Sequence, residues 1–323
     1  MTTSIVLATG NAQILFEPES TAVSADAEGL VHFIDPHDPC ASAFDLSVLR
    51  GDGIFEATTV WKGYPVSLEN HLRRLADSAR LMNMPEPNIA AFAAAVSQVA
   101  ARYDAAEPGP LMRILISRGL DPSTGVGEKS PCTGTPSVWI FLDGEGTLHS
   151  QTPIALTSLT RGYDSGITAK APWLLNGAKT LSYAVNQSMH RECDRRGVDD
   201  AVTVTTDGFT LECPNSSIVA QFGDAFVTPD PRIGILNGTS QRELFAWAQQ
   251  EGRSTAYRKL PFAELCEADR LYMTHGGWVM PVKSLDGRNY IVDPTNISTI
   301  NEAIHSGRTH DDAMTIGPDG DYE

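Results

Sequence analysis

The pattern of the 323-residue chain changes near residues 150 to 165, and this change limits the fold more than any other feature. The first part mixes a clearly helical segment with short apolar runs, whereas the second part is typical of strands joined by tight turns. A chain of this length also exceeds the size that one hydrophobic core usually serves. We therefore expect a smaller N-terminal α/β domain at residues 1–155, a larger domain at 156–309 and an acidic flexible tail at 310–323.

The first part carries one strong helical signal. Apolar residues recur there at spacings of three and four, at positions 68, 72, 75, 79 and 82. Ser67 is expected to cap this helix and Pro85 to stop it. A second helix is expected over residues 89–103.

Two buried strands are expected next, at residues 111–117 and 137–142. The connection between them, residues 119–136, is long and is expected to be flexible or lid-like.

The second part contains a strong hairpin signal, the Asp207-Gly208 dipeptide between expected strands at 200–206 and 209–211. Further strands are expected at 217–222 and 225–228. Ser240 and Glu243 have the spacing of a capping box, which predicts a helix that begins there and ends near Gly252.

Charge and cysteine content exclude several classes of function. The net charge of −16 argues against nucleic acid as a partner, because phosphate binding needs clustered basic residues. The five cysteines are scattered, so we predict neither a disulfide framework nor a metal site. No apolar run approaches ~18 residues and the N-terminus lacks a signal-peptide pattern, so we expect a cytoplasmic protein with no membrane partner.

The segment KAPWLLNGAKTLSYAVN, residues 170–186, holds two lysines in different contexts. Lys170 precedes a proline in a loop-like stretch. Lys179 follows two small residues and is expected at the start of a helix that runs to Gly197. Most lysines are solvated surface residues, but a desolvated amine with a depressed pKa can bond covalently to a carbonyl carbon.

Other residues have two readings as well. Glu212, between expected strands, suits either an edge charge or a partner for a protonated ring nitrogen. Residues 234–240, GILNGTS, precede a helix and offer N–H groups and hydroxyls either to an anion or only to the helix as a cap. The loop from Thr274 to Gly277 suits a close approach to a ligand or an ordinary turn. Its His275 is either an acid or base or simply exposed.

Arg74 lies near the edge of the apolar stripe of the first helix. A guanidinium in such a place favours an anion. The alternative is an ion pair with Asp77 or Glu69 on the same helix, which contributes little.

The order of these motifs resembles that of the class IV aminotransferases, the fold-type IV enzymes that use pyridoxal 5′-phosphate (PLP). GDGIFEA, HLRRLADSA, a lysine, D-G-x-x-x-E and GILNGTS follow one another between residues 48 and 283. The resemblance implies an α/β, two-domain fold like that of D-amino-acid aminotransferase, with PLP between the domains. It also implies a homodimer and a small-molecule amino substrate.

The resemblance implies roles for single residues. Lys179 would bond to PLP and move protons at the substrate carbon, and Glu212 would keep the pyridine nitrogen protonated. Arg74 would bind the phosphate and Tyr183 would lie beside the ring oxygen. The remaining cofactor contacts would come from Ser216, Ser217, Thr239 and Ser240, and the substrate contacts from Phe55, Thr274, His275, Gly276 and Gly277. The sequence departs from the family where the usual Asn is Ser217 and where G-I-T-R is replaced by residues 238–241, GTSQ.

Within the family, ILISRG and GTSQ most resemble the actinobacterial aminodeoxychorismate lyases, which convert 4-amino-4-deoxychorismate to 4-aminobenzoate and pyruvate in folate biosynthesis. The R-x-H of D-amino-acid transaminases and the Y-x-R-P of branched-chain enzymes do not occur in the corresponding segments. The alternative is a PLP-dependent transaminase acting on a branched-chain, D-amino or amine substrate. A catalytically silent protein that kept the fold is a third possibility.

Overall fold

A computed structural model describes residues 5–18, 23–24, 27–103, 109–124, 134–143 and 152–317. The chain forms two compact units, residues 1–147 with 178–183 and residues 148–177 with 184–323. The first unit thus ends before the predicted boundary at residue 155. It also takes in the short segment 178–183, which contains Lys179 and which the sequence assigned to the second domain.

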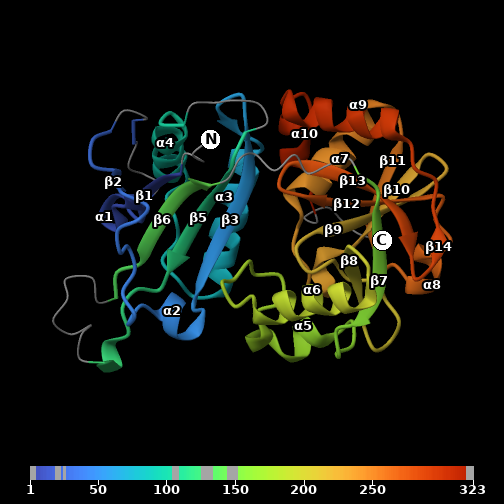
Figure 1. Cartoon of the computed structure of the whole chain (residues 1–323), viewed down its shortest axis with the longest axis horizontal. Helices are drawn as coiled ribbons and strands as arrows, with labels where there is room; N and C mark the ends of the chain where they lie inside the picture. Colours follow the sequence, from blue (N-terminus) through green and yellow to red (C-terminus); the bar gives the residue numbers. More distant parts are fainter. Residues whose placement is uncertain are drawn as a thin grey trace. The chain divides into compact units, whose positions relative to one another are not determined.

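The first unit is built on an antiparallel sheet with the strand order β2-β1-β6-β5-β3-β4 (Figure 1). Its strands are β1 (Val6–Gly10), β2 (Val31–Ile34), β3 (Gly53–Trp61), β4 (Tyr64–Pro65), β5 (Leu111–Ser117) and β6 (Ser137–Asp143). Its helices are α1 (Ala12–Leu15), α2 (Leu46–Arg50), α3 (Leu68–Leu81) and α4 (Ile89–Ala100).

The two long helices of this unit confirm the sequence periodicity. α3 packs against β3, and α4 packs against β1 and β6, so the apolar stripe of each helix is buried on the sheet. α4 ends at Ala100, three residues before the predicted end. Ser67 does not cap α3 with its side chain and instead has a left-handed backbone with φ 54°. The predicted position of the cap is confirmed, but the side-chain hydrogen bond of a serine cap is not formed.

The predicted strands at 111–117 and 137–142 are confirmed as β5 and β6. Of the long connection between them, Pro122–Thr124 forms a short 3-10 helix. Residues 125–133 lie outside the described part of the chain, so the predicted lid-like loop stays a prediction.

The second unit has a mixed sheet with the strand order β11-β10-β9-β12-β13-β7-β8, and β14 pairs with β13 (Figure 1). Its strands are β7 (Ile154–Thr160), β8 (Asp200–Val204), β9 (Ser217–Phe222), β10 (Ala225–Pro229), β11 (Ser254–Arg258), β12 (Arg270–His275), β13 (Trp278–Leu285) and β14 (Arg288–Asn289). Its helices are α5 (Ile167–Lys170), α6 (Ala184–Arg196), α7 (Thr239–Gln250), α8 (Phe262–Leu265), α9 (Pro294–His305) and α10 (His310–Thr315).

The central helix of this unit is α7, whose residues 239–248 are all buried. α7 packs on β9, β11, β12 and β13, and α9 packs on β13 and α7. A helix that packs on a sheet on one side and against another helix on the other side is expected to be buried all round.

Three of the four predicted strands of this unit are confirmed, as β8, β9 and β10. Residues 209–211 are not a strand of the sheet. They turn back at Asp207-Gly208 and pair with β8 through the isolated bridge between Val204 and Thr210 and through the hydrogen bond from the Leu211 N–H to the Thr203 carbonyl. The hairpin turn is present, but its second arm is too short to form a full strand.

The predicted capping box is wrong. The residue at the N-cap of α7 is Gly238, and no side chain caps the helix there. The Ser240 hydroxyl oxygen accepts a hydrogen bond from the Gly277 N–H at 2.8 Å. Glu243 instead accepts a hydrogen bond from the Thr309 hydroxyl. Both side chains are therefore committed to tertiary contacts and not to the helix end.

The C-terminal segment also differs from the predicted flexible tail. Residues 310–315 form α10, whose Ala313 is buried, and Gln250 of α7 donates to the Asp312 carboxylate at 2.6 Å. The last six residues lie outside the described part of the chain. Among the described residues, no helix is both long and apolar enough to cross a membrane.

Candidate active site

Lys179 lies in an extended segment beside β3, not at the start of a helix as predicted. The Phe55 N–H donates to the Lys179 carbonyl at 3.0 Å, and the Lys179 N–H donates to the Ser78 hydroxyl of α3 at 3.1 Å. α6 begins only at Ala184. The backbone of the lysine is therefore fixed on one side by the sheet and on the other by α3.

Gly53 makes this close approach possible. A Cβ atom at residue 53 would lie 2.7 Å from the Leu181 side chain and 2.4 Å from the Ile116 carbonyl oxygen. Gly53, the first residue of β3, is therefore required by its packing against both β5 and the Lys179 segment.

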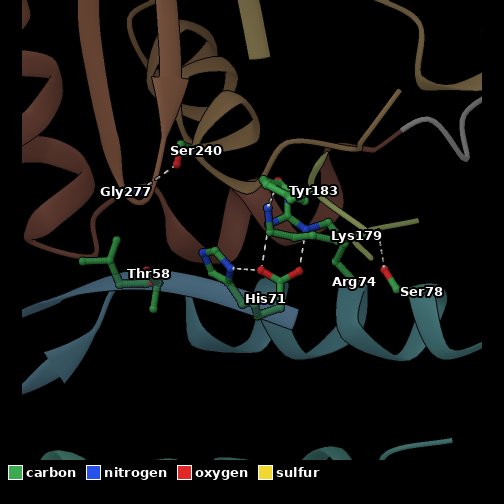
Figure 2. Close-up of polar contacts among 10 residues, drawn as sticks. Thr58, His71, Arg74, Ser78, Lys179, Tyr183, Ser240 and Gly277 are labelled. Atoms are coloured by element: carbon green, nitrogen blue, oxygen red, sulfur yellow. Dashed lines mark hydrogen bonds and ion pairs between the residues drawn. The ribbon is translucent and has the colours of Figure 1, made fainter. Parts of the chain in front are cut away.

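The Lys179 amine is buried against the rings of Phe55 and Tyr183, and Figure 2 shows it beside Tyr183. The side chain is 8% exposed, its Nζ lies 4.4 Å from the centre of the Phe55 ring, and it donates to the Tyr183 hydroxyl at 3.5 Å. The two rings meet edge to face at 5.1 Å. Lys170, in contrast, is exposed and pairs with Asp164 at 3.0 Å. Of the two lysines, Lys179 has the desolvated surroundings that nucleophilic amines need.

A buried ion cluster joins β3 to α3, the helix that holds the lysine backbone. Glu56 of β3 accepts two hydrogen bonds from Arg74, from Nε at 2.7 Å and from Nη2 at 2.8 Å. His71 Nδ1 lies 2.6 Å from the second carboxylate oxygen. Glu56 is 1% exposed and His71 2% exposed.

The protonation states in this cluster follow from its geometry. Burial works to raise the pKa of Glu56, but the charges and hydrogen bonds of Arg74 and His71 outweigh it and hold that pKa well below its usual value. Burial lowers the pKa of His71, despite the attraction of Glu56. Glu56 is therefore an anion and His71 is neutral at pH 7, and His71 donates its Nδ1–H to Glu56.

The predicted same-helix partners of Arg74 have other partners. Asp77 pairs with Arg80, and Glu69 pairs with Arg73. Neither Glu56 nor His71 was predicted from the sequence. The signal was present, because a glutamate in a buried strand position needs basic partners, and positions 71 and 74 are one helical turn apart.

In the second unit, Glu212 follows directly on the buried Leu211 and precedes the buried Cys213. Its carboxylate accepts the Leu236 N–H at 3.1 Å, and its carbonyl accepts the Thr203 N–H at 2.9 Å. The side chain is half-buried. Glu212 is thus a carboxylate held in place by the backbone of residue 236.

Four segments of the second unit meet at the start of α7. A Cβ atom at Gly238 would lie 2.3 Å from the Ser217 hydroxyl, so the helix begins directly against β9. Ser217 is paired with Thr274 across β9 and β12. Ser240 holds the N–H of Gly277, as described above. We name the set Ser216, Ser217, Gly238, Thr239, Ser240, Thr274 and Gly277 the hydroxyl cup.

The hydroxyl cup contains polar atoms that the protein does not satisfy. Within the described part of the chain, Ser216 Oγ and Thr274 Oγ1 are buried and have no hydrogen-bond partner. Thr239 and Ser240 are the first two residues of α7, where backbone N–H groups point along the positive end of the helix dipole. Buried hydroxyls and a helix start are a donor set that fits a phosphate group.

The turn after Thr274 is held from behind by α9, which the sequence analysis did not anticipate. His305 Nε2 lies 2.9 Å from the Gly277 carbonyl, and Asn301 accepts the Val279 N–H at 2.8 Å. Burial lowers the pKa of His305 to about 4, so the ring is neutral and donates its Nε2–H. His275 and Gly276 occupy the half-buried tip of the turn.

Comparison with known proteins agrees with this arrangement. The family model for amino-transferase class IV matches residues 53–285. The chain belongs to the class IV aminotransferase family. A bifunctional aminodeoxychorismate lyase / D-amino acid transaminase from Mycobacterium tuberculosis is 35% identical over 265 residues, which are 79% of this chain and 89% of that protein.

Solved structures of this family confirm the predicted fold. A fold IV-transaminase from Curtobacterium pusillum has a TM-score of 0.82 and 33% identity, and the match covers 94% of this chain and 99% of that chain. A hypothetical aminotransferase from Mycobacterium tuberculosis, solved in a PLP-bound form, has a TM-score of 0.79 and 28% identity over 94% of this chain and 100% of that chain. The chain is thus a two-domain α/β enzyme of fold type IV.

Proposed function

We propose that the protein is a PLP-dependent lyase that converts 4-amino-4-deoxychorismate to 4-aminobenzoate and pyruvate, a step of folate biosynthesis. The observation that carries the PLP part of the proposal is the buried Lys179 amine between Phe55 and Tyr183. The name of the 35% identical relative supports the lyase part. PLP would supply an electron sink for the carbon that bears the substrate amine.

The residues of the chain would divide the work. Lys179 would hold PLP covalently and, once the substrate amine has displaced it, take the proton from the carbon that bears this amine. Tyr183 would donate to the ring oxygen, and Glu212 would keep the ring nitrogen protonated. Arg74 and the hydroxyl cup would bind the phosphate.

The substrate would be oriented by Phe55 and by the turn formed by Thr274, His275, Gly276 and Gly277. The N–H groups of such a turn suit a substrate carboxylate. As a member of a family with this fold, the chain would act as a homodimer on a small amino substrate.

A transaminase is the second candidate, and a specific observation favours it. The same 35% identical relative is also named a D-amino acid transaminase. Both reactions require Lys179 to remove the same proton. They would differ afterwards, because the lyase substrate would lose pyruvate, whereas in transamination Lys179 would give back the proton that it holds.

The absorption spectrum tests the cofactor. Purified protein reconstituted with PLP should show a visible band that Lys179→Ala abolishes, while the exposed control Lys170→Ala keeps it. A wild type that acquires no band would overturn PLP chemistry at Lys179.

Product analysis tests the reaction. Incubation with 4-amino-4-deoxychorismate should give 4-aminobenzoate and pyruvate in equal amounts. Parallel incubations with D- or branched-chain amino acids and a keto acid would detect transamination. Turnover in the second set alone would replace the lyase by the transaminase.

A further inference from the structure

We infer that Glu56 is a positioning residue for the cofactor: it holds the Arg74 guanidinium in one fixed orientation as a phosphate receptor, and His71 locks Glu56 in place. This inference rests on the proposed binding of PLP. It concerns two residues, Glu56 and His71, to which the proposed function assigns no role.

The fork geometry supports the fixed orientation. Nε and Nη2 of Arg74 each donate to a different oxygen of Glu56, at 2.7 and 2.8 Å. Two parallel hydrogen bonds to a carboxylate set the plane of a guanidinium, which a single bond cannot do. The remaining edge of the fork, which carries Nη1, is therefore directed by the position of Glu56 on β3.

His71 removes the remaining freedom of the carboxylate. Its Nδ1 lies 2.6 Å from the oxygen that also accepts Arg74 Nη2. His71 and Arg74 are three positions apart on α3, so one helix face supplies all three hydrogen bonds. The carboxylate is then held by donors whose own backbone is rigid.

The same face of α3 also holds the lysine. Ser78, four residues beyond Arg74, accepts the Lys179 N–H at 3.1 Å (Figure 2). His71, Arg74 and Ser78 thus form one buried polar stripe on α3. Through this stripe α3 fixes both the Arg74 guanidinium and the backbone of Lys179. The position of the proposed phosphate receptor therefore depends on the same helix as the position of the Lys179 amine.

The helix offers a matched control. Arg73 pairs with Glu69 at 2.8 Å, and both side chains are about half exposed. The two arginines are neighbours in sequence and each pairs with one glutamate. Only the Arg74 pair is buried, so only Glu56 has the rigidity that positioning requires.

The test compares the affinities of the apoprotein for PLP and for pyridoxal, which lacks the phosphate. The quantity measured is the dissociation constant for pyridoxal divided by the dissociation constant for PLP, both obtained by fluorescence titration. Glu56→Gln is isosteric but puts an amide donor against the donors of Arg74 or His71, so we expect this ratio to fall about tenfold. Glu69→Gln should leave the ratio unchanged.

A double variant separates positioning from general structure. If Glu56 acts through Arg74, then Glu56→Gln combined with Arg74→Lys should lower the ratio no further than Arg74→Lys alone. A merely structural role would lower the urea midpoint and leave the ratio as in the wild type. Where Glu56→Gln does not fold, Glu56→Asp keeps the charge but shortens the reach and should lower the ratio in the same direction.

The outcomes are distinguishable. An unchanged ratio in Glu56→Gln, or in Glu56→Asp where that variant is used, overturns the inference and leaves PLP binding intact. Additive losses in the double variant also overturn it. A wild type that binds neither compound overturns the proposed function and this inference with it.

Discussion

The surroundings of Lys179 in the first unit and the hydroxyl cup in the second unit are built from opposite kinds of groups. The first unit buries charges, and Glu56, His71 and Arg74 satisfy one another. The hydroxyl cup in the second unit buries neutral hydroxyls, and those of Ser216 and Thr274 have no partner in the described chain. An unpaired buried charge would cost far more than an unpaired hydroxyl, so buried hydroxyls can be left open to a ligand at a lower cost than buried charges.

This difference leads to different expectations for substitutions. A change in the charged cluster should mainly lower the stability of the apoprotein, because its partners lose their compensation. A change in the hydroxyl cup should mainly lower ligand affinity. Glu212 would be a third case under the proposed function, because its charge would also be needed by the cofactor ring.

The largest effect is expected for Glu212→Gln. The amide cannot keep the ring nitrogen protonated, so kcat should fall at least about a hundredfold while PLP still binds. Steady-state kinetics and PLP titration measure the two quantities. Glu302→Gln, an exposed glutamate of α9, is the control and should behave as the wild type. A near-normal kcat for Glu212→Gln would remove Glu212 from the catalytic machinery.

The next effect is expected for the stability of Glu56→Gln. This variant leaves the Arg74 charge buried without its counter-ion, which typically costs about 3–5 kcal/mol of unfolding free energy. Glu69→Gln loses only an exposed pair and should cost less than about 0.5 kcal/mol. Urea unfolding of both apoproteins measures the difference. Equal losses would show that the Glu56 cluster is not a special part of the first unit.

Local patterns in the sequence predicted the two long helices and two of the strands of the first unit. The apolar spacing that gave α3 and the apolar runs that gave β5 and β6 are periodic signals, and tertiary packing follows them. The caps were less predictable. Ser67 and the Ser240–Glu243 pair have the right sequence for capping, but tertiary partners or a left-handed backbone replaced the local hydrogen bonds.

The candidate site was predictable only in part, because contacts between distant segments leave little trace in one sequence. Lys179 could be singled out through the order of the motifs, but its place beside β3 depends on hydrogen bonds to residues more than a hundred positions away. Glu56 and His305 were missed for the same reason. Each acts through a partner on another element, and no local period marks such a pair.

A third prediction concerns His305 and pH. Its pKa of about 4 in the folded protein lies below the usual value of about 6.5 in unfolded chains. Between these values the unfolded state binds more protons, so the contribution of His305 is complete above about pH 6.5 and is lost as pH falls toward 4. His305→Gln keeps an N–H donor without titrating. The stability advantage of the wild type over this variant should shrink by about 1–2 kcal/mol from pH 7 to pH 4, after allowance for partial exposure.

Urea unfolding of wild type and His305→Gln at pH 7, 5.5 and 4 measures this change, because the titrations common to both proteins cancel in the difference. A constant difference would mean that His305 does not hold the Gly277 carbonyl as a neutral donor. The hydroxyl cup would then not be supported from α9 by an uncharged donor.

The smallest and most selective effect is expected for Thr274→Val, with Thr228→Val as its matched control. Both threonines are buried in the same sheet, but the Thr228 hydroxyl donates to the Ile218 carbonyl at 2.7 Å, whereas Thr274 Oγ1 has no partner among the described residues. Thr228→Val should therefore lower the unfolding free energy of the apoprotein by about 1 kcal/mol and leave PLP affinity unchanged. Thr274→Val removes an unsatisfied group, so apoprotein stability should stay the same or rise, while PLP affinity falls about fivefold. If Thr274→Val lost stability and kept its affinity for PLP, the Thr274 hydroxyl would be a structural group. The contrast between the mutually paired groups around Glu56 and the unpaired hydroxyls of the hydroxyl cup would then not hold for Thr274.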